Sequence, residues 1–415
     1  MDRSLLKDVL LTQAKRAGEE RLVPRTLFSK IKELSGTPFI IIISGVRRSG
    51  KSTLLQELRS DNSYYINFDD DRLVKFSLED FQVMQELLIE LYGEKNVFLF
   101  DEIQNIPGWE RYVRRLHDQK KKIYISGSNA SMLSRELGTH LTGRNISLRL
   151  FPFSFAEYLL WGGVSLKIDN LTSTEKSVLK KAYNEYLSDG GFPEYVKSKK
   201  EEYVRSLYEN IIYRDIITRY SLSSEKPIKE AVYYIASNIG KEISYNTLKN
   251  FTGLTSATTI REYLEYLENS YVAFLVPKYS PSLKKQSYAS KKVYLIDTCL
   301  ARILGFRPSE DKGRMMENAV FLSLKREYDE IFYHKDKKEC DFIVRLQGKI
   351  SLAVQVTAVL SESNRERETQ GLIEALEKYR LDKGTIITED QEGELIIANK
   401  KISIAPIWRW LIENE

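Results

Sequence analysis

Short apolar runs alternate with polar, helix-forming stretches in the first part of the chain. Strands that alternate with helices build βαβ units and a mostly parallel sheet. Ahead of them, apolar residues at helical spacing between Leu5 and Leu11 predict a short amphipathic helix that packs on the sheet domain. The runs with the length of buried strands are 38–44, 64–68, 97–100, 123–126 and 146–151.

The second half of the chain is helical first and mixed later. Two short helices, 243–251 and 256–269, are joined by a turn that contains Gly253, which predicts a helix-turn-helix. The segment 271–296 has apolar ends around a lysine-rich centre and predicts a β-hairpin. After residue 300 the pattern returns to alternating helices and strands, which predicts a further α/β domain.

The run from Gly45 to Ser52 fits G-x-x-x-x-G-K-S and stands between the first predicted strand and a helix. Its glycines let backbone N–H groups turn toward phosphates, and the helix N-terminus adds its dipole. We expect Lys51 to reach the outer phosphates of ATP and the Ser52 hydroxyl to bind Mg²⁺. The predicted ATP-binding residues of this loop are Gly45, Val46, Arg47, Arg48, Ser49, Gly50, Lys51, Ser52 and Thr53.

Two further strand ends carry polar residues suited to phosphate chemistry. The apolar strand 97–100 ends in Asp101 and Glu102, where Asp101 is expected to hold Mg²⁺ and Glu102 to polarise the attacking water. The strand 123–126 leads into Ser128 and Asn129, which would face the γ-phosphate or that water.

These motifs, with Gly143-Arg144 and the run 150–155, resemble the prokaryotic AAA+ ATPases, and the resemblance extends over nearly the whole chain. It implies that Ser128 or Asn129 is the first sensor and that Asn67 restrains Glu102. It also implies that Arg144 is an arginine finger that acts on the nucleotide of a neighbouring subunit. A structural ion pair explains Arg144 equally well.

The turn Gly190-Gly191-Phe192-Pro193 resembles one in related signal-transduction ATPases. There the residue equivalent to Pro193 packs on the adenine of ATP. A plain turn before a helix explains Pro193 as well.

The helix-turn-helix and the hairpin after it look like a winged helix. Thr255, Thr258 and Arg261 would then face a DNA groove, and the lysines within 284–292 would meet phosphates. The helix 256–269 carries a single arginine, so a regulatory lid or a protein-docking module is an equally good interpretation.

The last domain resembles the restriction-endonuclease-like fold, with Glu317 on a helix and Asp341 and Gln355 on strands. An active site of that fold needs an Asp for Mg²⁺ and a second acid two residues before a Lys. Gln355 and Thr357 stand where Glu and Lys are expected, so we predict a degenerate nuclease site. Candidate substitutes for the missing lysine are Lys335 and Lys338.

Composition narrows the remaining choices. Lys and Arg number 63 against 58 Asp and Glu, a net charge of +5 that permits an anionic partner without requiring one. With 2 Cys and 3 His, neither a disulfide framework nor a zinc site is expected. The apolar runs are too short to cross a bilayer, so we predict a cytoplasmic protein without a membrane partner.

The predicted fold class is α/β, in four parts. They are an N-terminal helix with an AAA+ P-loop parallel-sheet domain (1–160), a helical lid or linker (161–225), a winged-helix domain (226–300) and a restriction-endonuclease-like domain (301–415). The predicted function is Mg²⁺-dependent ATP hydrolysis coupled to DNA, in an assembly of several copies of the chain. The alternatives are a slow ATP-dependent switch acting on proteins and, third, an ATP-coupled nuclease.

Overall fold

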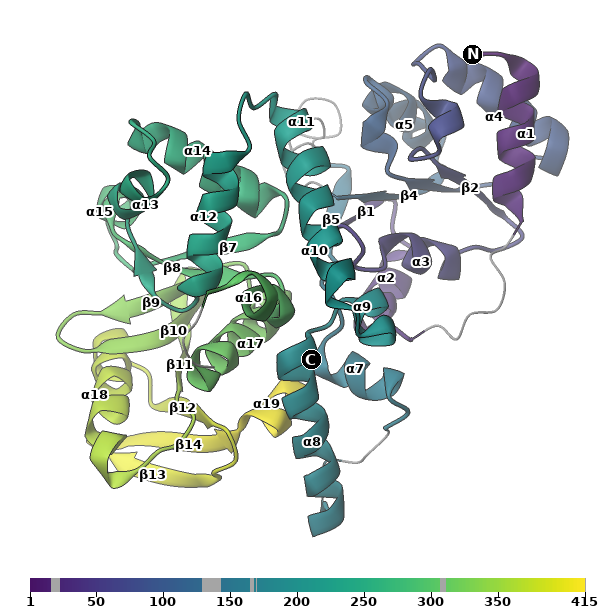
Figure 1. The fold of residues 1–415 in the computed structure, drawn as a ribbon. Helices are drawn as coiled ribbons and strands as arrows, with labels where there is room; N and C mark the ends of the chain where they lie inside the picture. Colours follow the sequence, from purple (N-terminus) through teal and green to yellow (C-terminus); the bar gives the residue numbers. More distant parts are fainter. Residues whose placement is uncertain (16–22, 129–142, 165–167, 169, 307–310, 415) are drawn as a thin grey trace. The chain divides into compact units, whose positions relative to one another are not determined.

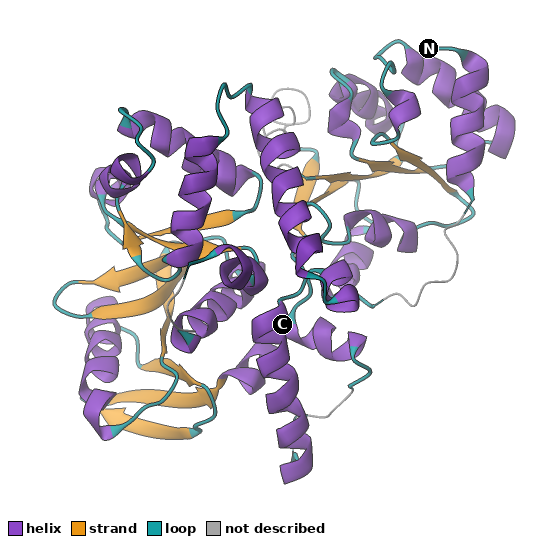
Figure 2. Cartoon of the chain, in the orientation of Figure 1, coloured by secondary structure: helices purple, strands orange, loops and turns teal. Residues whose placement is uncertain are grey.

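The computed structural model describes residues 1–15, 23–128, 143–164, 168, 170–306 and 311–414. The chain separates into two compact units, 1–151 and 152–415. Figures 1 and 2 show the helices and strands that make up each unit. The finer division into four domains stays a prediction.

The first unit is built on a five-stranded sheet in the order β2-β3-β4-β1-β5, and every pair of neighbouring strands is parallel. This order places β4 between β1 and β3, so the carboxyl ends of all three strands lie side by side. The strands are β1 (Ile40–Ser44), β2 (Ser63–Asn67), β3 (Val97–Asp101), β4 (Lys122–Gly127) and β5 (Asn145–Arg149). The helices are α1 (Arg3–Ala14), α2 (Thr26–Leu34), α3 (Lys51–Glu57), η1 (Asp71–Leu73), α4 (Asp80–Tyr92), η2 (Ile103–Asn105) and α5 (Trp109–Asp118).

Helices cover both faces of this sheet because successive strand residues point to opposite sides. Ile40 and Ile42 of β1 face a core shared with α1, α4 and α5, whereas Ile41 and Ile43 face a core shared with α2 and α3. Figure 1 shows these two groups of helices on opposite sides of the sheet. Burial on both faces explains why β1 is a run of four isoleucines. The predicted N-terminal helix is confirmed, since Leu6, Val9 and Leu10 of α1 are buried.

The second unit begins with helices and continues into a three-stranded antiparallel sheet in the order β6-β8-β7. The helices are α7 (Phe155–Trp161), α8 (Ser173–Asp189), α9 (Pro193–Ser198), α10 (Glu201–Asn210), η3 (Ile211–Ile217), α11 (Thr218–Tyr220), α12 (Lys226–Ser237), α13 (Tyr245–Phe251) and α14 (Ala257–Asn269). The strands are β6 (Glu242–Ile243), β7 (Ala273–Pro277) and β8 (Lys291–Leu295). The predicted helix pair and hairpin are therefore present, but the lysine-rich centre of the hairpin forms a helix, α15 (Leu283–Tyr288).

A six-stranded mixed sheet follows, in the order β13-β14-β12-β11-β10-β9. Apolar residues of α18, including Leu372 and Leu376, cover one face of this sheet. They pack against Ile343 of β10 and Ile386 of β12. The helices are α16 (Thr298–Leu304), α17 (Lys312–Glu327), α18 (Glu362–Tyr379) and α19 (Ile407–Glu413). The strands are β9 (Ile331–Lys335), β10 (Glu339–Leu346), β11 (Lys349–Val356), β12 (Lys383–Thr388), β13 (Gly393–Ile397) and β14 (Lys400–Pro406). Within the described residues, no helix has the length and apolar character needed to cross a membrane.

Candidate active site

The phosphate-loop motif lies where strand β1 ends and helix α3 begins, as the sequence predicts. A Cβ atom at Gly45 would lie 2.1 Å from the carbonyl oxygen of Leu150, so only glycine permits this close approach of the loop to the chain after β5. Gly50 has φ +99°, a backbone conformation that favours glycine, and it precedes the first residue of α3. The two glycines therefore fix the course of the loop at both ends.

Lys51 is the first residue of α3 and is only 4% exposed. Its ammonium group donates hydrogen bonds to the carbonyl oxygens of Gly45 and Val46, both at 3.0 Å. It also lies 3.8 Å from a carboxylate oxygen of Glu102. The ammonium is thus held inside the curve of the loop, where a phosphate of a bound nucleotide would meet it.

Asp101 ends strand β3 and is fully buried. Its carboxylate accepts hydrogen bonds from Ser126 of β4 and from the Tyr65 hydroxyl of β2, the latter at 2.9 Å. Burial and the neighbouring Glu102 charge raise the pKa of Asp101, while hydrogen bonds from Ser126 and Ser52 oppose that rise. A cation beside the buried Asp101 carboxylate would stabilise its negative charge.

Glu102 follows Asp101 in a left-handed backbone conformation with φ +53°, which is uncommon for a residue with a side chain. Its backbone N–H donates to the Ser126 hydroxyl at 3.2 Å, and its carboxylate accepts from the Gln104 amide. Burial raises the pKa of Glu102, but the positive charges of Lys51 and Arg47, together with hydrogen bonds to the carboxylate, outweigh burial, and the pKa lies below its usual value. Glu102 is therefore an ionised carboxylate at neutral pH, as a group that orients or deprotonates water must be.

Arg25 belongs to this site, although no sequence motif points to it. Its guanidinium donates to the carbonyl oxygen of Ser49 at 2.8 Å and to that of Phe151 at 2.6 Å, and the side chain is buried. It thereby ties the phosphate loop to the segment that follows β5.

The structure describes only one of the two predicted sensor residues, Ser128 and Asn129. Ser128 is buried directly after β4, and its backbone hydrogen-bonds the Glu102 carboxylate. Asn129 lies outside the described residues. Asn67 ends β2 beside Asp101, but its amide oxygen accepts from the backbone N–H of Asp69 at 2.9 Å instead of restraining Glu102.

Arg144 lies at the opposite edge of the sheet from the phosphate loop. Its carbonyl oxygen accepts from Ile40 N at the start of β1, whereas the loop follows Ser44 at the end of β1. Five strand residues span about 16 Å, which is beyond the reach of an arginine side chain. Arg144 forms an exposed ion pair with Asp118 at 2.9 Å. Its side chain cannot reach the phosphate loop of its own chain, and its predicted action on a neighbour's nucleotide stays a prediction.

Pro193 begins helix α9 in the second unit, so its predicted packing on adenine also stays a prediction. The turn before it depends on a buried carboxylate that the sequence did not single out. Asp297 accepts from the backbone N–H of Gly191 at 2.8 Å and from that of Cys299 at 2.9 Å. A Cβ at Gly190 would lie 1.6 Å from the Asp297 carboxylate, which explains the glycine there.

The residues of the predicted degenerate nuclease site do meet in the second unit. Glu317 of α17 and Asp341 of β10 both accept hydrogen bonds from the Lys292 ammonium, and the Gln355 amide oxygen accepts from Asp341 N at 3.2 Å. The expectation that Lys292 meets phosphates at the surface is wrong, because its side chain is 2% exposed and paired with carboxylates. Lys335, a predicted substitute for the missing lysine, pairs with Glu242 and with Glu339, a carboxylate that also faces Lys292.

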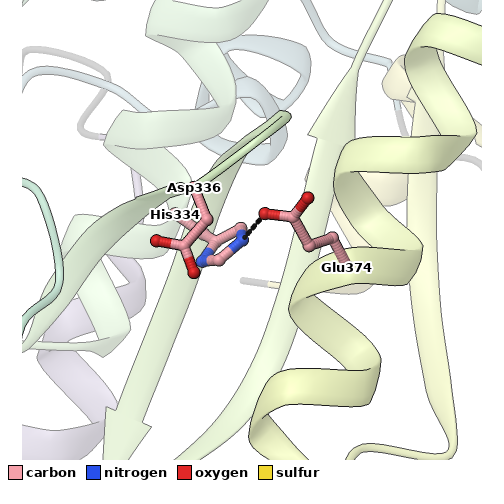
Figure 3. Close-up of side chains that lie close together, drawn as sticks. All are labelled: His334, Asp336 and Glu374. Atoms are coloured by element: carbon pink, nitrogen blue, oxygen red, sulfur yellow. Dashed lines mark hydrogen bonds and ion pairs between the residues drawn. The ribbon is translucent and has the colours of Figure 1, made fainter.

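One other cluster has ligand atoms close together. His334, Asp336 and Glu374 offer such atoms within 4.8 Å of one another (Figure 3). Both ring nitrogens of His334 already have partners, Glu374 at 2.9 Å and the Tyr379 hydroxyl at 3.0 Å. Glu374 also accepts from the backbone N–H groups of residues 337 and 338, so the cluster fastens the β9–β10 turn to α18.

Comparisons with known proteins agree with the geometry of the first unit. A family model described as an AAA domain matches residues 37–159, and one described as a domain of unknown function (DUF8612) matches residues 180–310. Among solved structures, the Walker-type ATPase PABY2304 of Pyrococcus abyssi is 16% identical, with a TM-score of 0.45 over 68% of this chain and 96% of that one. The first unit thus carries an AAA domain, with the phosphate-loop motif at residues 45–52.

Curated relatives cover nearly the full chain. The uncharacterized protein MJ1544 of Methanocaldococcus jannaschii is 34% identical over 98% of this chain and 95% of the relative. An uncharacterized protein of Haemophilus influenzae is 32% identical over 84% of this chain and 89% of the relative. The chain belongs to the same protein family as these two.

Proposed function

We propose that the protein binds ATP with Mg²⁺ and hydrolyses it. In this proposal Lys51 and the loop amides neutralise phosphate charge, Ser52 and Asp101 hold Mg²⁺, and Glu102 orients or deprotonates the attacking water. The observation that carries it is the convergence of Lys51, Asp101 and Glu102 at one sheet edge, with 3.8 Å between the Lys51 and Glu102 charges.

The residues of this site fit both Mg²⁺ and the phosphates of ATP. Oxygen ligands are what Mg²⁺ prefers, and the buried Asp101 carboxylate hydrogen-bonds the Ser52 hydroxyl. Among the described residues no partner is found for the buried Ser49 hydroxyl, which lies in the loop that would enclose the phosphates. Bound phosphate would satisfy that hydroxyl, while Mg²⁺ would neutralise charge that develops during hydrolysis.

We further propose that ATP hydrolysis is coupled to DNA through a winged helix made of α13, α14, β7 and β8. Thr258 and Arg261 near the start of α14 are exposed, as are Lys284 and Lys285 of α15. Side chains of these kinds contact phosphates and base edges in helix-turn-helix proteins. The restriction-endonuclease-like domain, with its site closed by Lys292, would add a surface for binding without cleavage.

A switch that acts on proteins is the second candidate function. Glu262 and Glu265 are exposed on the same helix as Arg261, and their charges oppose the approach of a phosphate backbone. Such a protein would hydrolyse ATP slowly and would be indifferent to DNA.

Steady-state ATP hydrolysis by the full chain, with and without double-stranded, single-stranded and branched DNA at two salt concentrations, tests the proposal. Glu102→Gln is the blank, because it keeps the size and one acceptor oxygen of the side chain but not its charge. We expect this variant to bind ATP normally and to hydrolyse it about 10² to 10⁴ times more slowly. Normal turnover by Glu102→Gln would contradict the assigned role.

The DNA arm separates the two candidate functions. Stimulation by DNA that fades at the higher salt concentration supports the winged-helix proposal, because phosphate contacts are exchanged for counterions. Turnover that no DNA changes would favour the protein-directed switch.

A further inference from the structure

Lys292 lies at the centre of a carboxylate cluster in the second unit. Its ammonium nitrogen is 2.8 Å from Glu339, 2.8 Å from Asp341 and 3.0 Å from Glu317. An ammonium group has three N–H donors, and here each faces a different carboxylate. The lysine is 2% exposed, so these three groups replace the water that normally surrounds it.

The carboxylates come from two elements that the strand and helix geometry brings together. Glu339 and Asp341 are two residues apart on β10 and therefore share a face of that strand, while Glu317 comes from α17. Lys292 is followed two residues later by Tyr294, whose hydroxyl donates to Glu317 at 2.6 Å. Both side chains thus leave the same face of β8 and reach the same carboxylate.

The electrostatics of the cluster favour the charged form of Lys292. Burial alone would lower the pKa of Lys292, but the facing carboxylates, Asp341 first among them, raise it well above its usual value. Burial and the Asp341 charge raise the pKa of Glu317, an effect that Lys292 opposes. The charge of Lys292 is therefore stabilised by the facing carboxylates and not by solvent, whereas burial opposes the ionisation of Glu317.

Three carboxylates that converge on one buried cation also offer the oxygen ligands that a divalent metal ion prefers. Lys335 lies 3.2 Å from the other oxygen of Glu339, so the three carboxylates face two ammonium groups. Removing Lys292 would leave an excess of two negative charges when all three carboxylates are ionised. That excess equals the charge of one divalent metal ion.

We propose that Lys292 is a built-in cation that occupies a latent divalent-metal site formed by Glu317, Glu339 and Asp341. The ammonium fastens β8 to α17 and β10 and keeps Mg²⁺ or Mn²⁺ out. The second unit consequently binds no metal at this place and performs no metal-dependent hydrolysis there. This inference does not depend on ATP hydrolysis by the first unit.

Mn²⁺ binding to the nucleotide-free full chain tests the proposal, measured by titration calorimetry and by the loss of the free-ion signal in electron paramagnetic resonance. All variants carry Asp101→Asn, so that the first unit contributes equally. The test variant is Lys292→Met. The matched control is Lys291→Met, which removes the same charge from the adjacent residue, whose ammonium bonds to backbone carbonyl oxygens of Ser287 and Ala289.

Lys292→Met is expected to bind one more Mn²⁺ per chain than the Lys291→Met control. Its Kd should be at least about tenfold lower than that of any site in the control, and adding Asp341→Asn should abolish the extra site. A folded Lys292→Met variant that gains no Mn²⁺ would overturn the proposal.

If Lys292→Met does not fold, the proposal is tested on the parent chain, which carries Asp101→Asn and keeps Lys292. The proposal then requires that Glu339→Gln, which alters the most exposed carboxylate of the three, leaves Mn²⁺ binding by the parent unchanged. A parent Mn²⁺ site that disappears with Glu339→Gln would show that metal already binds beside Lys292, and the proposal would be wrong.

Discussion

Replacing Arg25 with alanine tests whether the phosphate loop is held from outside its own motif. The side chain joins two backbone carbonyl groups, one in the loop and one after β5, at 2.8 and 2.6 Å. Ser49 and Phe151, which carry these carbonyls, are themselves buried. Without the guanidinium, water has poor access to either acceptor.

The size of the effect follows from those two bonds. A buried acceptor left without its donor costs about 1–3 kcal/mol, so two acceptors cost about 2–6 kcal/mol. Part of this cost appears as lower stability of the first unit and part as weaker binding of ATP, because nucleotide must then order the loop. At the lower limit, a loss confined to binding corresponds to about a 30-fold higher Kd.

The loss of stability and the loss of ATP affinity can both be measured on the same variant. Fluorescent-nucleotide titration gives the Kd, and urea unfolding gives the free energy of unfolding of the first unit. Lys30→Ala is the matched control, because it removes an exposed positive charge from the neighbouring helix α2. Arg25→Lys should fall between wild type and alanine, since one ammonium cannot reach both carbonyls in the same geometry. If Arg25→Ala changes neither quantity more than Lys30→Ala does, the reasoning is refuted.

Three further changes probe other parts of the chain. Lys51→Ala should abolish ATP binding in the same titration, because no other ammonium lies inside the described part of the loop. Arg144→Ala should lower hydrolysis but not ATP affinity, and mixing it with Glu102→Gln should restore activity; normal hydrolysis by Arg144→Ala alone would remove the finger hypothesis. Burial raises the pKa of Asp297 to about 6 from 3.8, so its contribution to stability is full below about pH 4 and is lost as pH rises through about 6. Unfolding of Asp297→Asn across that range should therefore depend less on pH than unfolding of wild type.

The sequence predicts the first unit well because its signals are local. A strand buried on both faces reads as a run of apolar residues, and the positive φ of Gly50 is a local requirement of the turn into α3. Arg25 carries no such signal. Its partners are 24 and 126 residues away, and only the folded chain brings them together.

For Lys292, by contrast, the alternation of residues along a strand predicts part of the buried contact. A lysine-rich turn suggests solvent, and the preceding lysines of α15 are indeed exposed. From residue 291, however, the chain is a strand, and alternation places Lys292 on the same face as Tyr294 and opposite to Lys291. An inward lysine beside an inward tyrosine predicts a buried acidic partner, because burying an unpaired ammonium is too costly. That partner is Glu317, a residue of the predicted degenerate nuclease site, and Lys292 reaches it from a strand that the site prediction did not include.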